Sequence, residues 1–190
     1  MAHISNIACQ VVHEVFDRVA SDLSMLADRD IDVLQIDYEE RDDRPAGAGV
    51  VHISYRFGIM VGGKDVHHGA LIVPLAESIS LAGYLMMAPD AQVEAMRESG
   101  QLDNAMKEAM IEVGNFVAAA SDAALRSVGA RCDRVIFEGC QGVHKDVRPR
   151  LDYEEGSPLC VGRARISVAG SEPVECIVML PKEPYLTGAS

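Results

Sequence analysis

The order of the apolar periodicities along the chain constrains the fold most. Apolar residues recur every three or four positions over about residues 4–27, 75–87, 92–98 and 102–128, which predicts helices there. Two groups of β-branched, alternating segments predict strands at residues 31–38, 50–61, 66–75, 132–139, 159–170 and 174–180. Turn sequences such as Gly62-Gly63-Lys64 join neighbouring strands at hairpin length. The order helix, three strands, two or three helices, three strands predicts an α+β fold, in which a mostly antiparallel sheet carries its helices on one face.

One domain accounts for the whole pattern. The chain has 190 residues, of which 48% are hydrophobic and 24% charged, and this is enough to bury a core of ordinary composition. No internal repeat and no low-complexity linker divides it. We expect a single domain over residues 1–181 and a loose tail over residues 182–190.

Charge and cysteine usage argue against several classes of function. The chain carries 29 acidic and 17 basic residues, a net charge of −12, which argues against nucleic acid as a partner. Its five cysteines include no C-x-x-C pair, and His67 and His68 would point to opposite faces of a strand, so no metal site is predicted. The sequence lacks both a signal peptide and an uncharged apolar run of about 18 residues. We expect a cytoplasmic protein that does not insert into membranes.

The predicted helix over residues 102–128 has two contrasting faces. Its apolar face, predicted to pack on the sheet, holds Met106, Met110, Val113, Val117 and Ala124. The opposite face carries a line of acidic, polar and small residues: Glu108, Glu112, Asn115, Ala119 and Asp122. The line itself contains no lysine or arginine, and Asn115 with Gly114 beside it weakens the middle of a helix. The methionines at 86, 87, 106 and 110 are expected to fill the core.

Within this line, a carboxylate and an amide stand one helical turn apart. Glu112 and Asn115 together can hold a cationic group and orient a water molecule. An E-x-x-N pair also occurs by chance on the solvated faces of many helices. The pair therefore gains meaning only from its surroundings.

Those surroundings resemble the signature region of the CheC/CheX/FliY phosphatase family. In that family a strand and a helix precede a helix that bears the pattern (Asp or Ser)-x-x-x-Glu-x-x-Asn. GALIVPLAESISLAGYLMM and LDNAMKEAMIEVGNFVAAASDAAL follow this order, with Glu112 and Asn115 at the Glu and Asn positions and Glu108 where the family usually has Asp or Ser. The first helix lacks the second E-x-x-N of CheC-like members, so the layout is most similar to CheX.

The resemblance implies a phosphatase that accelerates hydrolysis of the aspartyl phosphate of a CheY-like response regulator, in chemotaxis or a related two-component circuit. Asn115 would hold the attacking water, and Glu112 would pair with the regulator's lysine. Glu108, Ala119 and Asp122 would contact the partner. Mg²⁺ would be bound by the regulator, so the chain would need no cofactor of its own. CheX is a dimer, and the strands at 50–60 and 159–168 are long enough to pair across a homodimer.

Two other interpretations stay open. Flagellar switch proteins resemble the family and use the fold for docking without hydrolysis, so the chain could be a non-catalytic docking or adaptor module. The chain could also be an unrelated α+β domain with a chance motif, in which case the acidic face of the 102–128 helix is expected to be buried.

Overall fold

The computed structural model describes residues 2–182, and it contains the predicted elements in the predicted order. They are α1 (Ala2–Ala27), β1 (Ile31–Arg41), β2 (His52–Val61), β3 (Asp65–Pro74), α2 (Leu75–Leu85), α3 (Asp90–Ser99), α4 (Asn104–Ser127), β4 (Arg134–Val143), β5 (Leu159–Val168) and β6 (Val174–Pro181). The long helix begins two residues later than predicted because the side chain of Asp103 caps it, accepting a hydrogen bond from the Met106 amide at 2.8 Å. Just past its end, Gly129 has a φ of 73°, the left-handed conformation that glycine favours there.

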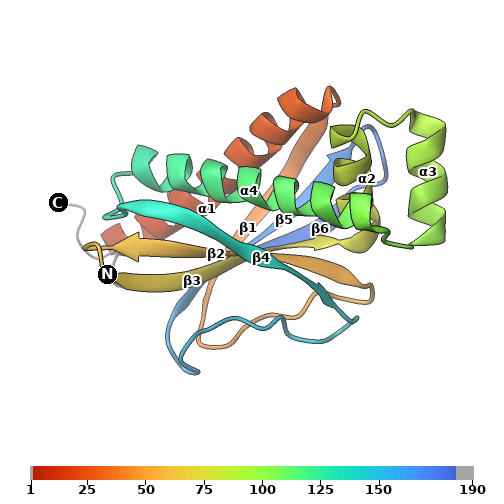
Figure 1. Cartoon of the computed structure of the whole chain (residues 1–190). Helices are drawn as coiled ribbons and strands as arrows, with labels where there is room; N and C mark the ends of the chain where they lie inside the picture. Colours follow the sequence, from red (N-terminus) through yellow and green to blue (C-terminus); the bar gives the residue numbers. More distant parts are fainter. Residues whose placement is uncertain (1, 183–190) are drawn as a thin grey trace.

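The strands form one antiparallel sheet in the order β1-β5-β6-β3-β2-β4. On one face, α1 packs over β1 and β5, and α4 packs over β4 and β2, so the two long helices lie side by side (Figure 1). The short helix α2 packs against α4, and α3 packs against α2 (Figure 1). The predicted α+β class, with an antiparallel sheet and helices on one face, is confirmed.

The sheet order has an internal symmetry that the sequence did not reveal. Exchanging β1 with β4, β2 with β5, and β3 with β6 gives the same order read from the opposite edge of the sheet, so every pair of neighbouring strands is preserved. Each half of the chain therefore contributes a long helix and three strands: α1 with β1–β3, and α4 with β4–β6. The first strand of each half pairs with a strand of the other half, β1 with β5 and β4 with β2. Both strands predicted to pair across a dimer, β2 and β5, are internal to the sheet, so that prediction is wrong. The open edges belong to β1 and β4.

The main core lies between the helices and the sheet, and a smaller apolar cluster lies on the opposite face. That cluster includes Ile72, Val161 and Met179 from the sheet and is covered by Leu151, which is 6% exposed. Leu151 belongs to the long loop between β4 and β5 (Figure 1). Within residues 2–182, no helix is long and apolar enough to cross a membrane. The predicted domain boundary stays a prediction, because residues 183–190 of the tail lie outside the described part.

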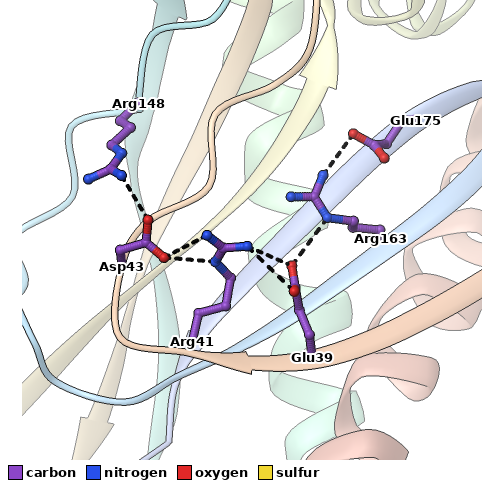
Figure 2. Close-up of polar contacts among 6 residues, drawn as sticks. All are labelled: Glu39, Arg41, Asp43, Arg148, Arg163 and Glu175. Atoms are coloured by element: carbon purple, nitrogen blue, oxygen red, sulfur yellow. Dashed lines mark hydrogen bonds and ion pairs between the residues drawn. The ribbon is translucent and has the colours of Figure 1, made fainter.

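An ion-pair network ties this loop to the outer face of the sheet (Figure 2). It joins Glu39, Arg41, Asp43, Arg148, Arg163 and Glu175 through contacts of 2.7–3.3 Å. Each of the six charges faces an opposite charge within the network. Because all of them are partly exposed, solvent screens each pair and its contribution to stability is small. We interpret the network as structural.

Candidate functional site

Helix α4 is fixed on the sheet by the apolar face predicted from the sequence. Met106, Met110, Val113, Val117 and Ala124 are each at most 2% exposed. Gly114 lets the helix approach β4 closely, because a Cβ atom at this position would lie 2.2 Å from Cε2 of Phe137. The glycine thus has a packing role that its low helix propensity alone did not indicate. The close contact sets the position of the next residue, Asn115, relative to the sheet.

Glu112 and Asn115 lie side by side on the exposed face of α4. The Asn115 amide donates a hydrogen bond from Nδ2 to Oε2 of Glu112 at 3.4 Å, and both residues are exposed. This orientation leaves Oδ1 of Asn115 and Oε1 of Glu112 available as acceptors. The chance-motif interpretation expected a buried acidic face, and the structure instead exposes the pair to solvent.

Glu108 and Ala119 extend this face by one turn in each direction, and both are exposed. Among the described residues, neither Glu108 nor Glu112 forms an ion pair. The methyl side chain of Ala119 leaves the surface beyond Asn115 low. The middle of α4 therefore presents two unpaired carboxylates and one amide to solvent.

Asp122, the last residue of the predicted line, has a different environment. Its Oδ2 accepts a hydrogen bond from Nε of Arg126 at 2.6 Å, and its Oδ1 accepts one from the Val135 amide at 2.8 Å. Although the line itself contains no basic residue, Asp122 is paired with Arg126 one turn further along the helix. Its carboxylate joins the end of α4 to the beginning of β4. A partner-binding role for Asp122 stays a prediction.

Beside the Glu112–Asn115 pair lies an open groove that the sequence reasoning missed. The groove has a volume of about 520 Å³ and is lined by Leu85, Met86, Ala105, Glu108, Ala109, Ile111 and Glu112. Met86 is 37% exposed and Ile111 is 43% exposed, while Met87 beside them is 90% exposed. The prediction that methionines fill the core holds for Met106 and Met110 and is wrong for Met86 and Met87. The stop signal Ala88-Pro89-Asp90 could have indicated that both lie at an exposed helix end.

The histidine and cysteine side chains singled out in the sequence form no metal or nucleophile site among the described residues. Nδ1 of His68 lies 2.9 Å from Oε2 of Glu138, across β2 at Gly58, where a Cβ atom would collide with the same carboxylate. The five cysteines are free, and burial raises the pKa of Cys132 and of Cys160 to about 11, which suppresses their thiolate forms. Within residues 2–182, no group of three His, Cys, Asp or Glu residues could hold a metal ion.

Comparison with known proteins identifies the fold. No family model and no curated protein matches the sequence. Among solved structures, FliY from Thermotoga maritima matches with a TM-score of 0.68 at 13% identity, covering 100% of this chain and 98% of FliY. The middle domain of FliM from H. pylori matches with a TM-score of 0.60 at 10% identity, covering 92% of this chain and 90% of that chain, and a chain of the FliG–FliM complex from H. pylori matches with the same TM-score at 9% identity. The chemotaxis protein CheX from Desulfovibrio desulfuricans matches with a TM-score of 0.55 at 15% identity, covering 89% of this chain and 96% of CheX.

At these identities the likeness establishes the fold. The resemblance to the CheC/CheX/FliY family noted in the sequence is confirmed at this level, over nearly the whole length of the chain. The same fold occurs in chemotaxis proteins and in proteins of the flagellar switch, so the site decides between their functions.

Proposed function

We propose that this chain is a phosphatase that accelerates hydrolysis of the aspartyl phosphate on a CheY-like response regulator, in chemotaxis or related two-component signalling. One observation carries the proposal: Glu112 and Asn115 lie hydrogen-bonded and outward-facing on a helix of the CheX fold. A protruding pair of this kind suits insertion into the site of another protein.

Asn115 would supply the orientation of the attacking water. Hydrolysis of a phosphoryl group requires a water in line with the phosphorus and little covalent chemistry from the protein. Because Nδ2 of Asn115 donates to Glu112, its Oδ1 is left to accept a hydrogen from that water. The water would then present its lone pair to the phosphorus. An amide does not act as a general base, so the role of Asn115 is positioning of the nucleophile.

Glu112 would fix the approach of the two proteins. One of its oxygens accepts from Asn115, and the other is open to an ammonium group of the regulator. The same carboxylate would thus hold the amide in place and pair with the regulator's lysine. Mg²⁺ in this reaction would be bound by the regulator, and the role of this chain requires no cofactor of its own.

A second candidate function is docking without hydrolysis. FliM, which shares the fold, is found in a complex with FliG, so the fold also serves in assemblies of the flagellar switch type. An adaptor would bind its partner through the same exposed face and would have no need of the amide of Asn115. The effect of this residue on phosphate release therefore separates the two functions.

We also propose a cytoplasmic location. In addition we propose a homodimer, because the chain resembles CheX, which is a dimer. The open edges of β1 and β4 are where two sheets could join, because an edge strand presents unpaired backbone groups.

The decay of phosphorylated regulators tests the proposal. Each response regulator of the same organism would be phosphorylated, and loss of its phosphoryl group would be followed with and without this chain. We expect at least one regulator to lose its phosphoryl group faster when this chain is present at a lower molar concentration than the regulator. Unchanged decay of every regulator, with complexes still formed, would favour the adaptor function.

A further inference from the structure

The groove beside Glu112 combines an apolar lining with an acidic rim. Leu85 and Met86 from the end of α2 face Ile111 of α4, and Glu108 and Glu112 contribute the carboxylates. Glu112 belongs to both the groove and the proposed catalytic pair. A protein that reaches Asn115 would therefore also contact the groove.

The apolar residues at this place are unusually exposed. Ile111 is 43% exposed and is the one large apolar residue within α4 with such exposure among the described residues. Met86, which also lines the groove, is 37% exposed, and the residue after it in the chain, Met87, is 90% exposed. Exposed apolar groups gathered at one site mark a surface that another molecule covers.

The charges at the groove restrict what can cover it. Glu108 and Glu112 have no ion-pair partner among the described residues, whereas Asp122 on the same helix is bound by Arg126. Two unpaired carboxylates at the rim disfavour an acidic occupant and favour a cationic one. The nearby Lys107 is exposed and adds one positive charge, which does not offset the two acids. The groove therefore fits an apolar side chain that is accompanied by lysine or arginine.

We propose that this groove is a docking site that determines which regulator is bound. It would take an apolar side chain and an adjacent cation from the surface of the regulator next to its phosphorylation site. Met86 and Ile111 contact the apolar side chain, and Glu108 pairs with the cation. This inference rests on the proposed function, and it assigns recognition to the groove and water orientation to Asn115. Recognition and chemistry are thus separable by substitution.

Binding of activated regulators tests the groove directly. The probes are the purified response regulators of the same organism, each activated with beryllofluoride, which mimics the phosphoryl group. For the regulator that the full-length chain binds best, Met86→Ser and Ile111→Ser are each expected to weaken binding about tenfold. In turnover experiments they raise KM by a similar factor and leave kcat within about twofold. Glu108→Gln slows association and reduces its dependence on salt.

Val147→Ser is the matched control. Val147 is 49% exposed in the loop on the opposite side of the sheet, so the same kind of substitution there leaves binding unchanged. Thermal unfolding of each variant establishes that it is folded.

Two results would refute the docking role of the groove. In the first, Met86→Ser and Ile111→Ser bind the regulator as tightly as the unmodified chain does. In the second, the unmodified chain binds no activated regulator. If the chain binds a regulator through the groove but does not accelerate its dephosphorylation, the docking role of the groove is supported and the proposed phosphatase function is refuted.

Discussion

The ring of Phe137 on β4 occupies the space into which a side chain at Gly114 of α4 would project. A Cβ atom there would lie 2.2 Å from Cε2 and 2.3 Å from Cζ of the ring. This contact brings the middle of α4 onto the edge strand of the sheet, directly before Asn115. The position of the proposed catalytic amide therefore depends on a glycine that does not itself contact a partner.

The contact predicts that Gly114→Ala destabilises the protein, although alanine is the better helix former. Helix propensity alone would increase the free energy of unfolding by about 1 kcal/mol. The clash with Phe137 outweighs this gain, and we expect a net loss of about 1–2 kcal/mol, measured by urea denaturation. In the Phe137→Leu background, where the ring is absent, the same substitution should be neutral or stabilising. Stabilisation by Gly114→Ala in the unmodified chain would show that the contact does not constrain α4.

We expect Asp122 to stabilise the folded chain. Asp122→Ala removes the acceptor of both Arg126 and the Val135 amide, so we expect the free energy of unfolding to fall by about 1–2 kcal/mol. Glu108→Ala is the matched control, because it removes an unpaired carboxylate from the same helix face and should change stability by less than about 0.5 kcal/mol. If Asp122→Ala instead weakens binding of the regulator and leaves stability unchanged, the partner-binding role predicted from the sequence is correct.

His52 predicts a loss of stability in mild acid. The side chain is 3% exposed, and this burial lowers its pKa below the usual value of about 6.5. In mild acid, His52 therefore binds a proton more readily in the unfolded chain than in the folded chain. His52 therefore costs no stability above about pH 6.5. Below that pH the free energy of unfolding decreases as the pH falls towards the folded-state pKa of His52.

Urea denaturation at several pH values between about 7.5 and 5 tests this sign. His52→Gln should reduce the decline of the free energy of unfolding with falling pH, whereas His144→Gln, at an exposed histidine, should not. A steeper decline in His52→Gln would mean that the folded chain takes up the proton more readily than the unfolded chain, contrary to the burial of this ring.

Local patterns determined much of this structure, and the sequence predicted those parts. The buried face from Met106 to Ala124 and the exposed pair Glu112 and Asn115 follow from the 100° rotation per residue of one helix. The turn at Gly62-Gly63-Lys64 likewise joins β2 and β3 as predicted. The pairing of Asp122 with Arg126 was also accessible, because the two residues are four apart on a helix.

Contacts between distant segments account for what the sequence did not predict. The need for Gly114 depends on Phe137, which belongs to the following strand. The interior positions of β2 and β5 depend on strands contributed by the other half of the chain.

The most direct test of the central claim is the rate at which this chain accelerates dephosphorylation of its regulator when Asn115 is replaced. Asn115→Ala should bind the beryllofluoride-activated regulator as tightly as the unmodified chain but lose about 100-fold of the acceleration, because the water is no longer oriented. Asn104→Ala, at an exposed asparagine at the beginning of the same helix, should retain full acceleration. Undiminished acceleration by a folded Asn115→Ala variant would contradict the account.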